Sequence, residues 1–209
     1  MTNIKLLETL TTILNKANYN DVSFYQDLEK LIDSVKEDYT KEEAKKNGTG
    51  NLLKYAKAII KNIPSFRQDA LSGECKINDN YIILDSYRIL ASKHSLSLHN
   101  LNPENYPGKL VSEYLKEFDN LENLQDVNLP EVSQLKMYIT EEKAKQKAAG
   151  TKAPFIPYKN IIIDNITINA SFLLDALQAG FNKCYYKNRT FFFTDNTENK
   201  SIILGVYAK

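Results

Sequence analysis

Two aspartates stand at matching points of the chain, each directly after a short apolar segment. Asp85 follows Ile82-Ile83-Leu84, and Asp195 follows Phe191–Thr194. Two carboxylates held side by side would suit the general acid and base of a hydrolase. Aspartate is also a frequent turn residue, because its side chain accepts hydrogen bonds from backbone N–H groups close by in the chain. We favour the turn role and keep the hydrolase as the less favoured interpretation.

Other residues that could do chemistry lack the spacing that chemistry needs. His94 and His99 lie five residues apart, outside the three-to-four spacing of a helical metal pair. Cys75 and Cys184 have no cysteine or histidine close in sequence, so we interpret them as small core residues and keep a Cys–His nucleophile as the alternative. The segment 48–50 lacks the glycine spacing and the lysine of a phosphate-binding loop. The sequence therefore predicts no metal, no cofactor and no enzymatic activity.

Basic side chains are the stronger candidates for function. Lysines recur at helical spacing between positions 54 and 61, where they form one stripe of a predicted helix. The expected contacts with DNA or with a partner protein are Lys54, Lys57, Lys61, Arg67 and Arg88. For Arg88 and the neighbouring Tyr87, the alternative is an internal ion pair and a core ring.

Helices are expected to dominate residues 1–47. Apolar spacing predicts one helix over 4–14 and a second that contains Leu28–Val35. The pattern Thr40-Lys41-Glu42-Glu43 is typical of a capping box, which predicts a short third helix that stops at Asn47-Gly48. A DNA-reading helix-turn-helix is the alternative. We favour a simple helical hairpin, because the second helix is acidic and has the wrong sign for a major groove.

The rest of the chain mixes helices with short strands. We expect helices over 51–63, 109–118, 130–140 and 170–180, and strands near 73–77, 81–91, 161–163, 183–186, 190–194 and 201–207. This order predicts an α+β fold. The predicted organisation is an N-terminal helical segment, 1–47, followed by one domain, 48–209, which contains a helical insertion at about 103–152.

The second and fourth quarters of the chain share one pattern. Each runs helix, strand, turn, strand, aspartate-containing turn, strand. The segment Glu74-Cys75 opens the first set of strands and Lys183-Cys184 opens the second, and the aspartate follows 10 or 11 positions after the cysteine. We interpret the pattern as an internal repeat of a strand–helix–three-strand unit, with a chance match of two α+β halves as the alternative.

This repeat resembles one domain of the DNA sliding clamps, the processivity factors, and small clamp-like proteins of phages and mobile elements. Leu173-Leu174-Asp175-Ala176-Leu177 looks like the core of the short helix in a clamp, and Ser201–Val206 is similar to the closing strand. Asp85, Tyr87 and Arg88 match the Asp-x-Tyr-Arg strand that precedes a helical insertion in the small clamp-like proteins. The likeness covers 51–95 and 155–209, about half of the chain.

The resemblance implies a non-enzymatic binding protein that acts on DNA or on DNA-handling proteins. A clamp joins several domains into a ring with basic inner helices, whereas this chain holds one domain, and its second helix presents Asp175 and Gln178. A ring would need about six copies joined edge to edge, so we expect no closed ring, although smaller oligomers stay possible. The alternative is a viral antagonist that binds and inhibits a host defence protein, with the inserted helices as its interface.

Composition narrows the source and the compartment. The formal net charge of the 209 residues is +1, so neither strong nucleic-acid affinity nor an acidic DNA mimic is predicted. Two cysteines make no disulfide framework, and no apolar run reaches the length of a membrane helix. We therefore expect a cytoplasmic protein without a membrane partner. Lysine (24), asparagine (22) and isoleucine (19) use A/T-rich codons, which suggests a low-GC bacterium or its phage.

Overall fold

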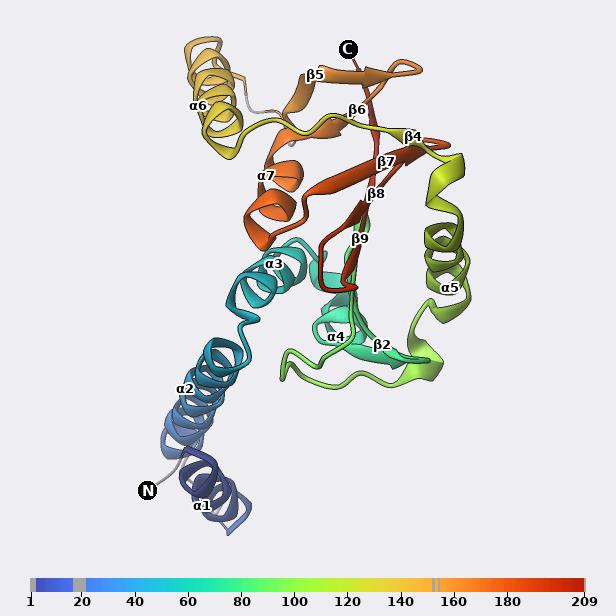
Figure 1. Cartoon of the computed structure of the whole chain (residues 1–209). Helices are drawn as coiled ribbons and strands as arrows, with labels where there is room; N and C mark the ends of the chain where they lie inside the picture. Colours follow the sequence, from blue (N-terminus) through green and yellow to red (C-terminus); the bar gives the residue numbers. More distant parts are fainter. Residues whose placement is uncertain (1–2, 17–21, 152, 154, 209) are drawn as a thin grey trace. The chain divides into compact units, whose positions relative to one another are not determined.

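The fold is α+β, with antiparallel sheets and helices in separate stretches of the chain. The computed structural model describes residues 3–16, 22–151, 153 and 155–208 (Figure 1). The chain divides into two compact units, Met1–Leu53 and Lys54–Lys209. The segment Asn18–Asp21, whose composition predicts a turn and an N-cap before the second helix, lies outside the described residues.

The first unit is a pair of helices. Helix α1 spans Asn3–Lys16 and helix α2 spans Val22–Lys46. Both present an apolar stripe, and the two stripes pack together around Leu10, Leu28, Ile32 and Val35. The predicted third helix is wrong as a separate element, because α2 continues through the expected cap. The Thr40 hydroxyl donates to the carbonyl of Lys36, one turn back, instead of capping a new helix. The stop is confirmed, since α2 ends at Lys46 and Gly48 takes a positive φ of 70°.

Helix α3, Gly50–Lys61, crosses the boundary between the units, and the second unit begins within it at Lys54. Its apolar stripe includes Ala56 and Ile59, both fully buried. The chain then passes Pro64 into the short helices η1, Ser65–Arg67, and α4, Gln68–Leu71.

Seven strands form the main antiparallel sheet of the second unit. Their order is β1-β2-β3-β9-β8-β7-β4. The strands span Cys75–Ile77 (β1), Asn80–Leu84 (β2), Arg88–Ser92 (β3), Lys200–Leu204 (β9), Thr190–Thr194 (β8), Lys183–Lys187 (β7) and Gln125–Asp126 (β4).

The first six strands of this order are arranged symmetrically. Three strands from residues 75–92 lie on one side of the centre, and three from residues 183–204 lie on the other, each set with its last strand innermost. The central ladder pairs Arg88 with Ile203 and Ala91 with Lys200. The first residues of β3 and β9 therefore lie at equal distances from the middle of the ladder.

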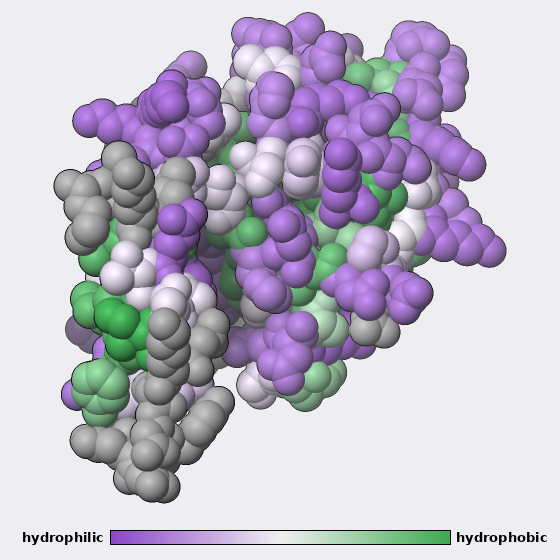
Figure 2. Space-filling view, turned by 90° about the horizontal axis from the view of Figure 1, so that it is seen from below, coloured by the Kyte–Doolittle hydropathy of each residue, from purple (hydrophilic) through white to green (hydrophobic). Residues whose placement is uncertain are grey.

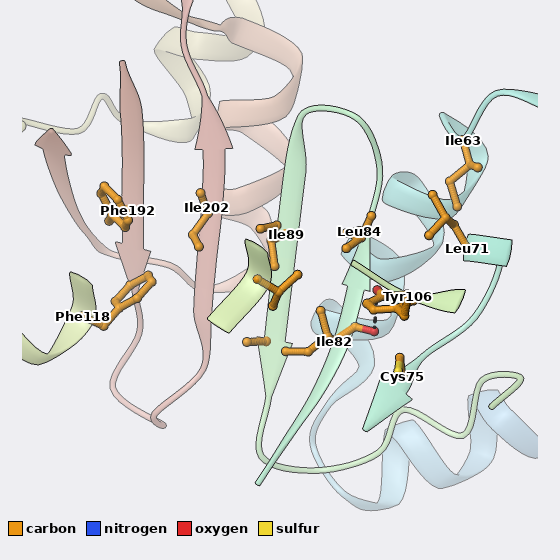
Figure 3. Packing of buried hydrophobic residues seen from close by; sticks show 12 residues of the cluster. Ile63, Leu71, Cys75, Ile82, Leu84, Ile89, Tyr106, Phe118, Phe192 and Ile202 are labelled. Carbon is orange, nitrogen blue, oxygen red and sulfur yellow. Dashed lines mark hydrogen bonds between the residues drawn. The ribbon is translucent and has the colours of Figure 1, made fainter. Parts of the chain in front are cut away.

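Helices cover both faces of this sheet (Figure 1). Helices α3 and α7, Ala170–Ala179, lie against one face, where the Tyr55 hydroxyl bonds to Ser201 of β9 at 2.7 Å. Helix α5, Gly108–Lys116, lies on the other face with η2, Pro103–Asn105, and η3, Glu117–Asn123, at its ends. The hydrophobic core between the sheet and α5 includes Val111, Phe118, Phe192 and Ile202. The Tyr106 hydroxyl donates to the carbonyl of Ile82 in this core (Figure 3). The expected insertion thus supplies part of the main core.

The last expected strand, 201–207, is two strands in different sheets. The chain leaves β9 at Leu204, and β10, Val206–Tyr207, pairs with β6, Ile166–Asn169, which pairs in turn with β5, Pro157–Ile163. Gly205 marks the break, since a Cβ at this position would lie 2.3 Å from Cγ2 of Ile166. Only glycine permits this approach.

Helix α6, Val132–Ala148, packs against α7. It begins two residues after Pro130, where the sequence predicts its start, because Glu131 is its N-cap residue. Leu135 and Ile139 are its buried side chains, and the Tyr138 hydroxyl donates to the carbonyl of Pro157 at 2.6 Å. These contacts hold α6 against β5 and α7.

Hydrophilic side chains cover most of the face that Figure 2 presents, and apolar side chains gather there in small patches. Among the described residues, no helix combines the length and the apolar character required to cross a bilayer.

Candidate functional site

The three lysines of α3 form a stripe that points away from the sheet. Positions 54, 57 and 61 lie within about 60° of one another on a helix of 3.6 residues per turn, and the buried stripe around Ala56 and Ile59 lies opposite. Lys54 and Lys61 are exposed and Lys57 is half-buried. Helix α3 contains no acidic residue. The lysines predicted from the sequence therefore do share one outward face.

Arg67 lies away from this stripe. It is an exposed residue of η1, where its guanidinium carbon lies 5.6 Å from the centre of the Phe66 ring. Arg67 lines a cavity of about 210 Å³ between α5 and the strand ends, with Leu84, Leu110 and Ile202 among the other walls. The structure thus puts Arg67 on the α5 side of the sheet, whereas the lysines belong to the helix on the other face.

Arg88 is an interior residue, and its side chain is inaccessible to DNA or to a partner protein. Its guanidinium is fully buried and bonds to three groups. Nε and Nη2 donate to the carboxylate of Asp85 at 2.9 and 2.8 Å, Nη1 donates to Asp175 at 3.1 Å, and Nη2 also donates to the backbone carbonyl of Ala58 at 2.8 Å. The ring of Phe172 lies 4.2 Å from the guanidinium carbon. The structure therefore matches the alternative of an internal ion pair, and we drop Arg88 from the proposed contact residues.

Local backbone geometry sets up this cluster. Oδ1 of Asp85 accepts the N–H groups of Tyr87 and Arg88, both at 2.7 Å, so one oxygen closes the β2–β3 turn while the other binds the guanidinium. Burial raises the pKa of Asp175, while the adjacent Arg88 charge lowers it. Tyr87 is not a core ring, because it is 39% exposed and lies against Phe155 with the ring centres 5.0 Å apart.

The two aspartates are not paired. The register aligns Leu84 of β2 with Phe192 of β8 and Ile82 with Thr194, so the two strands run in opposite directions. Asp85 consequently lies at one end of the sheet and Asp195 at the other. Asp195 closes its own turn by accepting the backbone N–H groups of Thr197 and Asn199, at 2.7 and 3.0 Å. Both residues fill the turn role, and the hydrolase interpretation loses its carboxylate pair.

The thiols show no sign of activation. Cys75 and Cys184 are buried free cysteines, and burial raises the pKa of each thiol. Within the described ranges, no group of three or more His, Cys, Asp or Glu side chains has the arrangement of a metal site.

Two further cavities, like the one beside Arg67, were not foreseen from the sequence. One, of about 270 Å³, continues along α5 between Leu110, Tyr114 and Lys187. The other, of about 420 Å³, lies between the end of α6 and the start of α7 and is lined by Lys143, Lys147 and Ser171, among others. Lysines at positions 136, 143 and 147, spaced by seven and four, are the signal by which sequence reasoning would have found this second basic stripe.

No protein-family model matches this chain, and neither the curated proteins nor the solved structures contain a significant match to it. The function is therefore argued from the geometry described above.

Proposed function

We propose that this chain is a non-enzymatic, clamp-like binding module that acts on duplex DNA. The observation that carries the proposal is the symmetric sheet with two helices on one face, one of which carries an outward stripe of lysines with no acidic residue in the helix. The module would hold DNA by its phosphates without reading its bases.

The arrangement of the strands supports an internal repeat. The six strands form two sets of three whose order mirrors about the β3–β9 ladder, and a helix precedes each set. The expected strand before that helix occurs only in the second set, where β6 precedes α7, whereas α2 precedes α3 in the first. Asp85 is the first residue after β2 and Asp195 the first after β8, and each closes its turn with backbone N–H groups. The cysteines match less well, since Cys75 begins β1 whereas Cys184 is the second residue of β7.

The edge of the sheet supports a module that acts without closing into a ring. Strand β7 would be the outer strand of the second set, but β4 of the insertion pairs with it, Gln125 opposite Tyr186. The N–H of Val127 also donates to the carbonyl of Cys184 at 2.9 Å. A second copy would have to displace β4 before it could pair with β7.

The electrostatics predict weak, salt-sensitive binding. The three phosphate contacts of the α3 stripe contribute about −2.7 to the slope of the logarithm of affinity against the logarithm of salt concentration. Lysine is a point charge that contacts phosphates without the bidentate geometry of arginine, so such a stripe suits binding without sequence preference.

The test is fluorescence anisotropy of a labelled 20-base-pair duplex at several KCl concentrations. We expect the triple variant K54E/K57E/K61E to bind at least tenfold more weakly than the unaltered chain at 50 mM KCl. The matched control K109E/K116E/K183E makes the same charge change at exposed sites outside α3 and should keep most of the affinity. Equal losses in both variants, or no binding by the unaltered chain, would refute the proposal.

A second candidate function is antagonism of a host protein through the insertion, as expected of a phage or mobile-element product. The supporting observation is Leu110 of α5, which is 53% exposed at the mouth of the apolar cavity beside Arg67. Deleting the insertion would remove Val111 and Phe118 from the core, so a surface substitution is the better test. Under this function, L110D abolishes partner capture from a host lysate, whereas K54E/K57E/K61E leaves it intact.

A further inference from the structure

Helix α6 carries a second lysine stripe that no sequence expectation includes. Lys136, Lys143 and Lys147 lie within about 40° of one another on the helix and are all exposed. The buried side chains Leu135 and Ile139 lie about 80° away around the helix axis. The stripe therefore borders the packed face of α6 instead of pointing away from the molecule.

The acidic residues of α6 do not cancel this stripe. Glu142 is bonded to Lys145 at 2.7 Å, and this ion pair lies on other faces of the helix. Glu141 lies about 140° from Lys136 around the axis. No ion pair of Lys136, Lys143 or Lys147 occurs in the described part of the chain.

The cavity between α6 and α7 shows where the stripe lies. It is lined by Lys143 and Lys147 from α6 and by Ser171 from α7. Ser171 belongs to the side of α7 that faces away from the sheet, opposite Leu173 and Ala176, which are fully buried. The lysines of α6 consequently stand beside the outward surface of α7.

The hydrogen bonds of Arg88 to Asp85, Asp175 and Ala58 place α3 on the side of α7 opposite α6. One guanidinium binds the carboxylate of Asp175 in α7 and the carbonyl of Ala58 in α3, so the middles of these helices lie side by side. Figure 1 shows α6, α7 and α3 in this order along one side of the sheet. Helix α7 thus lies between two lysine stripes.

The surface of α7 between the stripes carries one acidic side chain. Its polar outward residues are Ser171, Asp175 and Gln178, and Asp175 is the acidic one. Asp175 shares the single charge of Arg88 with Asp85, so these three groups together keep one net negative charge, against the six lysines of the two stripes.

We propose that α6 supplies the second half of a duplex-DNA-binding surface whose first half is the lysine stripe of α3. This inference rests on the proposed function and assigns a role to the inserted helix. Two rows of three lysines with a single carboxylate, Asp175, between them fit the phosphates of DNA, whereas lysine is depleted at protein–protein interfaces. The α6 stripe extends from Lys136 to Lys147, eleven helical steps or about 16 Å, which is long enough to follow several phosphates of one strand.

The test measures the affinity of a labelled 20-base-pair duplex against KCl concentration for K136E/K143E/K147E. Six contacts predict a slope of about −5.4 for the unaltered chain, and loss of three contacts reduces it to about −2.7. We expect the affinity of the variant at 50 mM KCl to fall at least tenfold, as for K54E/K57E/K61E. The control K109E/K116E/K183E should keep the steep slope. The variant K136Q/K143Q/K147Q removes the three charges without adding repulsion. Its slope should fall as far as that of K136E/K143E/K147E, whereas its affinity should fall less.

The outcomes separate this inference from the function on which it rests. If K54E/K57E/K61E weakens binding and K136E/K143E/K147E leaves both affinity and slope unchanged, the role of α6 is overturned and the proposed function stands. If neither variant changes the affinity or the slope, both the role of α6 and the proposed function are refuted. If poly-L-glutamate displaces the duplex at equal charge concentration, the surface is a site for acidic chains in general, which also overturns the assignment to DNA.

Discussion

Arg88 of β3 and Asp175 of α7 are joined by a hydrogen bond of 3.1 Å, although 87 residues separate them in the chain. The same guanidinium is bonded to Asp85 in its own turn and to the backbone of α3. One buried cation therefore ties together both helices on one face and the strand at the centre of the sheet. Its partners are not equivalent, because the Asp85 side chain is 1% exposed and that of Asp175 is 32% exposed.

This difference predicts unequal costs for removing the two carboxylates. Asp85→Ala should lower the free energy of unfolding by about 3–5 kcal/mol, because it leaves Arg88 buried without its main partner and opens the β2–β3 turn. Asp175→Ala should cost less than half as much, since solvent reaches that carboxylate. Urea unfolding followed by circular dichroism measures both. Equal costs would contradict the central role of Asp85.

Two buried tyrosines predict a loss of stability at high pH. Burial raises the pKa of Tyr55 and of Tyr106 above the ordinary value of about 10. Because the phenols stay protonated in the folded chain and ionise in the unfolded chain, their contribution is complete below pH 10 and decreases as the pH rises above it. Urea midpoints between pH 8 and 11 test this.

The control for this pH dependence is a pair of phenylalanine variants. Tyr55→Phe and Tyr106→Phe remove the ionisable group and keep the ring, so each should flatten the fall in stability above pH 10. Each should also lose stability at pH 8, because Tyr55 is bonded to Ser201 and Tyr106 to Ile82. An unchanged slope above pH 10 in both variants would show that the phenols are accessible.

The sequence predicts the elements whose signals are local. The apolar spacing of α3 and α7 sets their buried stripes, and the aspartates after β2 and β8 mark two turns. Thr40 is misleading because a capping box is only favourable where a helix starts, and the continuous stripe of α2 extends through it. The local i, i+3 spacing of Asp85 and Arg88 made an ion pair foreseeable. The bond to Asp175 depends on packing between distant segments and was not foreseeable.

The lysines illustrate the same limit for the candidate site. Spacing alone identifies the stripe of α3, and the same arithmetic identifies that of α6. That both flank α7 follows from tertiary packing, which no local pattern contains. The split between β9 and β10 is likewise nonlocal, since it depends on the approach of Ile166 to Gly205.

Neither cysteine should react with a thiol reagent in the folded chain. Cys75 and Cys184 are 0% and 3% exposed, and the raised pKa of each thiol keeps it protonated at neutral pH. With the chromogenic disulfide DTNB at pH 8, we expect no fast release of the coloured thiolate in native buffer. In 6 M guanidinium chloride we expect two equivalents of it per chain, one for each cysteine. Fast release of one equivalent from the native chain would identify an accessible thiol and reopen the Cys–His alternative.

Gly205→Ala should destabilise the second unit by about 1–3 kcal/mol, the usual cost of an overpacked interior. The added methyl would lie 2.3 Å from Cγ2 of Ile166 and 3.0 Å from the carbonyl oxygen of Arg189, to which the Gly205 N–H also donates. The ring of Phe191 is a third neighbour, with Cε2 at 3.2 Å, and because one of the three neighbours is backbone, a side-chain rotation alone does not relieve the contact. The matched control is Gly108→Ala, whose methyl would meet Cδ1 of Ile77 at 3.5 Å, an ordinary contact. That control should be neutral or stabilise the chain by up to about 1 kcal/mol. The thermal unfolding midpoint should therefore fall clearly for Gly205→Ala and stay unchanged or rise for Gly108→Ala. Equal changes of the midpoint in the two variants would contradict the close approach of β6 to the β9–β10 junction.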